Sequence, residues 1–203
     1  MIGNTHLDAL HDQAWRLLDR GKARAAIRLL EQALAHEELS ERQEADTRHL
    51  LGIAHSEAGD RRAMVREWLH VRQLDEHAER AAPLLSADRF QQIAEGALAE
   101  LPAALLKRLG DVAILVDSRP SERMVCDGID PRLLGLFSGL PLPDQSSLGG
   151  GGFPQVIQLF RANLEAEAHT REELGEQIRI TVLHETAHFF GLSDEELERM
   201  GLG

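Results

Sequence analysis

The first 82 residues combine helix-forming segments with a repeated pattern of apolar positions, and they contain no proline. Residues 14–34 and residues 51–71 each have the pattern of a helix, a glycine turn and a second helix. The turn glycines are Gly21 and Gly59, and glycine readily adopts the left-handed conformation that ends a helix. We therefore predict an all-α domain of paired helices over residues 1–82.

Apolar residues recur at corresponding positions of the two stretches. Ala26 and Met64 follow their glycines by the same interval, as do Leu30 and Trp68. The pattern covers roughly residues 7–80 and resembles tetratricopeptide repeats, whose usual period is ~34 residues. The resemblance implies a concave face that recruits a protein partner or substrate. A plain antiparallel four-helix bundle explains the same pattern.

Pro83 opens a region in which helical and strand-like patterns alternate. Ser86 stands where an N-cap is expected, and Thr170 with Glu173 has the form of a capping box. The stretch 133–153 is rich in Gly, Pro and Ser and predicts mostly loop. The predicted elements are helices over 86–101 and 102–110, strands over 111–117 and 154–160, and a helix over 170–190. This order predicts a small α+β domain at residues 83–203.

Net charge, cysteine content and the length of apolar runs limit the kinds of partner and the cell compartment that we expect. The formal net charge is −12, and an acidic surface repels phosphate backbones, so nucleic acid is not expected as a partner. Cys126 is the single cysteine, which excludes an intramolecular disulfide and fits a reducing compartment. No apolar run approaches the ~20 residues of a membrane helix, and no secretion signal is visible. We expect a cytoplasmic protein with no membrane association.

The last predicted helix carries the motif H-E-x-x-H. His184 and His188 lie one turn apart and share a face, with Glu185 beside them. Two such imidazoles can bind one zinc ion, and the glutamate can accept a proton from zinc-bound water. The apolar face expected to pack on the sheet consists of Ile180, Leu183, Ala187 and Phe190.

A catalytic zinc site needs three protein ligands and one open position. Only fifteen residues follow His188, so we expect the third ligand close by. Gly191 can end the helix, and Asp194 then falls six residues after His188, which completes the pattern H-E-x-x-H-x-x-G-x-x-D. Asp194 also has a simpler explanation, because Ser193 and Glu196 form another capping box and acids favour a helix start.

Residues from about 86 to 203 resemble a family of small zincin-like proteins called minimal metallopeptidases. The stretches that carry the resemblance are 133–142, 154–165 and 182–201. The resemblance implies one Zn²⁺ per chain held by His184, His188 and Asp194, with Glu185 as catalytic base. The expected function is zinc-dependent hydrolysis of a peptide or protein substrate.

Two other functions remain open. The chain could be a non-catalytic zinc-binding adaptor that acts through its helical repeats, and a closed zinc site would favour that role. A zinc-dependent RNA endonuclease is a weaker alternative, because one such family uses a third histidine and lacks the glutamate. The acidic surface also disfavours RNA.

The residues that would stabilise the oxyanion or bind the substrate are harder to assign. The chain has no tyrosine, so His169 or Arg179 could help to stabilise the oxyanion. Either predicted strand, 111–117 or 154–160, could pair with an extended peptide if it forms the edge of the sheet. The remaining polar candidates are Asp117, Asp127, Asp130 and Cys126, which solvated loop positions or an unreactive thiol explain as well.

Overall fold

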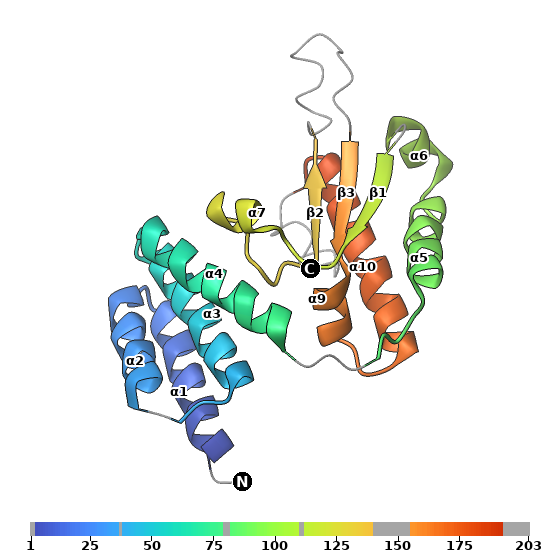
Figure 1. Cartoon of the computed structure of the whole chain (residues 1–203). Coiled ribbons are helices and arrows are strands. Elements are labelled where there is room, and N and C mark those ends of the chain that lie inside the picture. Colours follow the sequence, from blue (N-terminus) through green and yellow to red (C-terminus); the bar gives the residue numbers. More distant parts are fainter. Residues whose placement is uncertain (1–2, 37, 79–81, 110–111, 140–154, 193–203) are drawn as a thin grey trace. The chain divides into compact units, whose positions relative to one another are not determined.

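The computed structural model describes residues 3–36, 38–78, 82–109, 112–139 and 155–192 (Figure 1). It has the predicted α+β class, with an all-helical part followed by a small mixed sheet and its helices. The chain forms two compact units. The first comprises Met1–Arg80 and Pro120–Arg132, and the second comprises Ala81–Arg119 and Leu133–Gly203. None of the helices among the described residues is long and apolar enough to cross a membrane.

The first unit is built from four consecutive helices and a short fifth one. Each of the first four packs on the next along the chain. These helices are α1 (Gly3–Leu18), α2 (Ala23–His36), α3 (Glu41–Glu57) and α4 (Arg61–His77). Gly21 and Gly59 have φ values of 67° and 75°, which confirms the predicted left-handed helix stops.

The apolar positions predicted to pair these helices are buried. Ala26 and Leu30 lie in one cluster with residues of α1 and α3, and Met64 and Trp68 lie in a second cluster. At Gly52 of α3 a Cβ atom would lie 2.2 Å from Nε1 of Trp68. Only a residue without a side chain therefore lets the indole pack this closely on α3.

The segment Pro120–Arg132 packs with the first unit, whereas the predicted division placed all of residues 83–203 in the second domain. It contains α7 (Glu122–Cys126), whose Val125 is fully buried against Met64 and Trp68. The apolar pattern around Val125 is too short for the sequence to predict its contacts with Met64 and Trp68, which lie far away in the chain. Contact with α4 decides the place of α7.

Charged groups hold this segment as well. Arg132 donates two hydrogen bonds to Asp75, at 2.8 and 3.0 Å, and one of 2.7 Å to Asp46. Burial of Arg132 works to lower its pKa, but the hydrogen bonds to Asp75 and then Asp46 outweigh it, so the pKa is raised. Asp130 lies 2.8 Å from Nε2 of His49. The segment is thereby tied to both α3 and α4.

The second unit is a three-stranded sheet with helices. Its elements are α5 (Ala87–Ala99), α6 (Ala103–Leu109), β1 (Val112–Asp117), β2 (Gly135–Ser138), β3 (Gln155–Phe160), α9 (Arg161–Ala166) and α10 (Arg171–Phe189). The strand order is β1-β3-β2, with β1 parallel and β2 antiparallel to β3. The predicted strands and long helices are confirmed. The prediction of loop at 135–138 was wrong, because four residues with a glycine show no strand periodicity.

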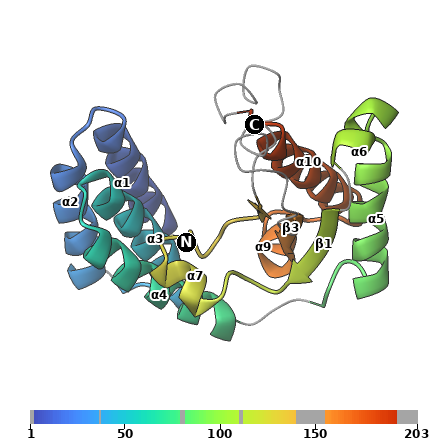
Figure 2. The ribbon, with the colours of Figure 1, turned by 90° about the horizontal axis from the view of Figure 1, so that it is seen from above.

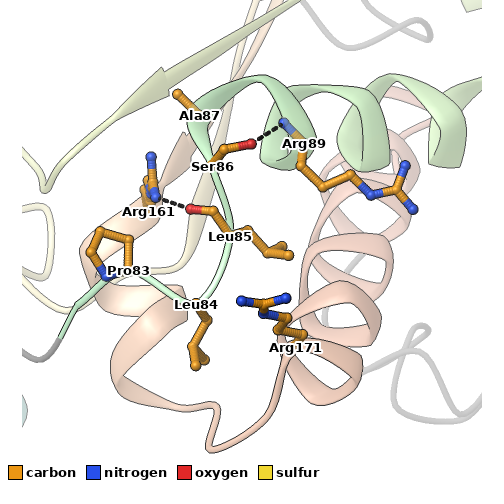
Figure 3. Close-up of a pocket in the computed structure, with 8 residues that line it drawn as sticks. All are labelled: Pro83, Leu84, Leu85, Ser86, Ala87, Arg89, Arg161 and Arg171. Carbon is orange, nitrogen blue, oxygen red and sulfur yellow. Dashed lines mark hydrogen bonds between the residues drawn. The ribbon is translucent and has the colours of Figure 1, made fainter.

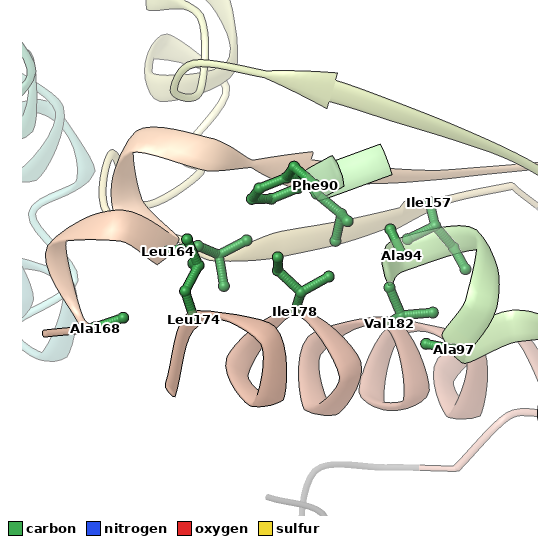
Figure 4. Packing of buried hydrophobic residues seen from close by; sticks show 10 residues of the cluster. Phe90, Ala94, Ala97, Ile157, Leu164, Ala168, Leu174, Ile178 and Val182 are labelled. Atoms are coloured by element: carbon green, nitrogen blue, oxygen red, sulfur yellow. The ribbon is translucent and has the colours of Figure 1, made fainter. Parts of the chain in front are cut away.

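Helices α5 and α10 pack side by side and against the strands, as seen from two directions in Figures 1 and 2. The core between them and the sheet contains the apolar side chains of Figure 4. Its members include Phe90, Ala94, Ile157, Leu164, Leu174, Ile178 and Val182. Buried Asn163 receives a hydrogen bond from Arg119 and donates one of 2.7 Å to the Leu133 carbonyl. It thus joins the two chain positions that flank the segment 120–132.

Candidate metal centre

Helix α10 positions the predicted motif. It begins at the predicted capping box, in which Thr170 accepts from the Glu173 amide and Glu173 accepts from the Thr170 amide. The predicted packing face was only partly correct. Ala187 is buried, but Ile180, Leu183 and Phe190 are half-buried. The fully buried apolar stripe consists instead of Leu174, Ile178, Val182 and Phe189, which shifts the face by about one position.

The two histidines of the motif face one another. The Nε2 atoms of His184 and His188 are 3.0 Å apart, and the ring centroids are 4.7 Å apart at an interplanar angle of 78°. Both rings are half-buried on the same face of α10. The spacing of one helical turn therefore brings two ring nitrogens to one point in space, as the sequence predicts.

The helix end orients His188. Gly191 has φ 81° and Leu192 N–H donates to the Ala187 carbonyl, which turns the chain back over the last turn. The Leu192 carbonyl then lies 3.1 Å from Nδ1 of His188. A carbonyl only accepts, so Nδ1 carries the proton in this bond, and in the neutral ring Nε2 keeps its lone pair. This is the arrangement of a metal-binding imidazole held by a backbone carbonyl.

The two nitrogens fit a zinc ion. Two ligands at ~2.0–2.1 Å in tetrahedral geometry are about 3.3 Å apart, close to the 3.0 Å between the two Nε2 atoms. The third predicted ligand, Asp194, lies outside the described residues. Within the described residues no group of three His, Cys, Asp or Glu side chains could hold a metal ion. The described part of the site is thus a pair of histidines.

Glu185 lies between the histidines in sequence and reaches the sheet. Its side chain is buried, and its Oε2 accepts a 2.7 Å hydrogen bond from the Phe137 amide of β2. Leu134 pairs with Phe160 by a backbone hydrogen bond, so in this antiparallel ladder the Phe137 amide points away from β3. Glu185 is therefore anchored at the outer edge of β2.

Gly135 makes this approach of α10 and β2 possible. A Cβ atom there would lie 2.6 Å from Cγ2 of Thr181, 3.1 Å from Cγ of Glu185 and 3.2 Å from its Oε1. Contacts below 3.0 Å force a shift of the neighbouring atoms. Gly135, which the sequence pattern placed in a loop, thus sets the position of the carboxylate.

Strand β2 changes the prediction of which strand could pair with an extended peptide. Among the described strands β3 is central, so the stretch 154–160 is not an edge, whereas β1 is one edge and β2 is the other. The edge that Glu185 contacts is that of β2. Sequence reasoning missed this strand, and the short apolar pair Leu136-Phe137 was its only signal.

The other candidates do not join the histidine pair. Arg179 forms a two-bond contact with Glu100, and exposed His169 precedes the first turn of α10. The acidic candidates are dispersed: Asp117 accepts from Gln158, Asp127 caps α7, and Asp130 pairs with His49. Cys126 is exposed.

Helix α10 bears the H-E-x-x-H motif and packs against a small mixed sheet. Residues 109–203 match the model of the family described as zincin-like metallopeptidase. A comparison with curated proteins gave no match. The match covers β1 to the last residue and supports zinc binding and hydrolase chemistry for this part of the chain.

Proposed function

We propose that the chain is a zinc-dependent metallopeptidase with His184, His188 and Asp194 as ligands of one Zn²⁺ per chain. The proposal rests on one observation above all. Two ring nitrogens converge to 3.0 Å on a helix of a segment that matches a zincin-like family. A bound zinc ion supplies a Lewis acid for the scissile carbonyl and acidifies water.

Groups of the protein itself would transfer the proton, position the carboxylate and bind the substrate. Glu185 accepts the proton of the attacking water and returns it to the leaving amine. The Phe137 amide holds that carboxylate in place from β2. An extended peptide adding to the outer edge of β2 would present its backbone beside Glu185. The substrate class is therefore a peptide segment able to adopt an extended conformation.

One observation favours a second function. The hydrogen bond between Glu185 and the Phe137 amide also joins α10 to β2, which is a structural use of the glutamate. A non-catalytic zinc-binding adaptor would keep this bond and the metal but hydrolyse nothing. Replacement of Glu185, described in the Discussion, separates the two functions.

Metal analysis tests the site directly. We expect about one zinc per chain in the purified full-length protein, and at least about 100-fold weaker zinc binding in His188→Ala and in Asp194→Ala, because each loses one of three ligands. Elemental analysis and competition with a zinc chelator measure both quantities. His169→Ala, which alters an exposed histidine before α10, should bind zinc as the native chain does. Absence of bound zinc after zinc is supplied would refute the proposed centre.

For the helical unit we propose recruitment of a partner or substrate protein through tetratricopeptide-like packing. A shallow groove on α4 supports this role. Its lining combines apolar Val65 and Leu69 with Arg62, Arg66 and His70. Apolar residues flanked by cationic groups suit an acidic amphipathic helix.

Charge reversal tests this recruitment. Arg62→Glu should weaken binding of a helical peptide of alternating Glu and Leu clusters by about three- to tenfold, as expected for a charge at the rim of an interface. Fluorescence anisotropy of the labelled peptide measures the change. Arg28→Glu, which alters an exposed position of α2, is the control. Equal binding by both variants would place the recruiting surface elsewhere.

A further inference from the structure

Three arginines line a cavity far from the histidine pair. The cavity has a volume of about 600 Å³ and lies within the second unit. Arg89 reaches it from α5, Arg161 from the start of α9 and Arg171 from the first turn of α10 (Figure 3). The backbone and side chains of Pro83–Ala87 form another wall. Three elements thus contribute one cation each.

The three arginines differ in the hydrogen-bond partners of their guanidinium groups. Arg161 bonds to Glu165 at 2.9 Å and to the Leu85 carbonyl at 2.5 Å. Arg89 has only the neutral Gln92 side chain, 3.4 Å away. The Arg171 side chain has no hydrogen bond or ion pair within the described parts of the chain. The guanidinium groups of Arg89 and Arg171 therefore have no carboxylate partner among these residues.

Arg89 and Arg171 are exposed and Arg161 is half-buried, so water screens part of the repulsion between the three cations. Like charges repel, and a cation in the first turn of a helix opposes the helix dipole, which favours anions there. Arg171 occupies such a position in α10, and Ser86 begins α5 at the same cavity. The chain is otherwise acidic, with a net charge of −12. A bound anion would remove the repulsion and complement both helix starts.

We propose that this cavity, termed the arginine pocket (Pro83–Ala87, Arg89, Arg161 and Arg171), binds a small phosphate monoester. Guanidinium groups donate up to five hydrogen bonds each in a planar fork that matches phosphate oxygens. A dianion with three terminal oxygens matches the two unneutralised arginines better than a single carboxylate. Leu84 and Leu85 provide apolar surface for the organic group.

The pocket is separate from the candidate metal centre. Arg171 and His184 are thirteen positions apart on α10, which corresponds to about 20 Å along a helix. The ligand is thus neither the peptide substrate nor a group bound to the metal. Its binding does not depend on zinc or on hydrolysis.

Calorimetry with phenyl phosphate as the probe, at constant ionic strength, tests the proposal. Arg171→Gln and Arg89→Gln should each weaken binding by about tenfold or more, because each removes charge-assisted hydrogen bonds. Lys107→Gln removes an exposed cation of the same unit outside the pocket and should leave the affinity unchanged. Inorganic phosphate should bind more weakly than phenyl phosphate because it lacks the apolar group.

Two further measurements make the outcome decisive. Binding should be weaker at pH 5.5 than at pH 7.5, because a phosphate monoester loses its second charge near pH ~6 whereas arginine stays protonated. Phenyl phosphate should also raise the unfolding temperature of the native chain but not of Arg171→Gln. Absence of binding, equal affinity in the arginine variants, or equal binding of benzoate would each overturn the proposal.

Discussion

Replacement of Glu185 by glutamine should lower peptide hydrolysis by at least ~100-fold while the protein retains its zinc. Glutamine has nearly the same shape, and its amide oxygen can still accept the hydrogen bond that the Phe137 amide donates to Glu185. It cannot take up the proton of the attacking water. The variant therefore separates the chemistry of the carboxylate from its packing.

The measurement compares turnover of a fluorogenic peptide library and zinc content for the native chain and Glu185→Gln. Glu172→Gln, at an exposed position in the first turn of the same helix, is the matched control. Equal hydrolysis by Glu185→Gln would remove the glutamate from the mechanism. If the zinc-loaded native chain cleaves nothing, the adaptor function is favoured instead.

Replacement of Arg132 by glutamine should destabilise the first unit by about 2–4 kcal/mol. Arg132 is the shared partner of Asp75 and Asp46, and its loss removes the ion pair that each carboxylate forms with it. Asp75 is largely buried, with a side-chain exposure of 16%, whereas that of Asp46 is 42%. Water thus screens part of the penalty at Asp46 only, which keeps the expected cost below that of a fully buried pair.

Urea unfolding followed by circular dichroism measures this loss, and hydrogen exchange locates it. We expect faster exchange in α7 and the adjoining residues of 120–132, since Arg132 ties this segment to α3 and α4. Arg123→Gln is the control, because the Arg123 side chain is 93% exposed. A change below about 0.5 kcal/mol for Arg132→Gln would show that the segment is held without the ion pairs of Arg132.

Local patterns predicted the features whose physical cause is local. Gly21, Gly59 and Gly191 adopt left-handed conformations because only glycine does so without a steric cost. The capping box at Thr170 involves atoms three residues apart, so its sequence pattern suffices. The convergence of His184 and His188 likewise follows from one turn of helix.

The surroundings of Glu185 could not be predicted in this way. The sequence shows that a glutamate stands beside the histidines, but Phe137 lies 48 positions earlier in the chain. The strand that carries Phe137 has four residues, too few for an alternating pattern. Its pairing with β3 and the close approach at Gly135 arise from packing of α10 against the sheet.

The sequence by itself determined the all-helical region, the mixed region, the helix ends and the pairing of His184 with His188. These features depend on hydrogen bonds and side-chain spacing within a few residues. Tertiary structure decided that Pro120–Arg132 packs with the first unit, that Glu185 reaches the edge of β2, and that Arg89, Arg161 and Arg171 share a cavity. These contacts join residues far apart in the chain. They form because apolar surface is buried and charges are paired throughout each unit, which no short stretch of sequence encodes.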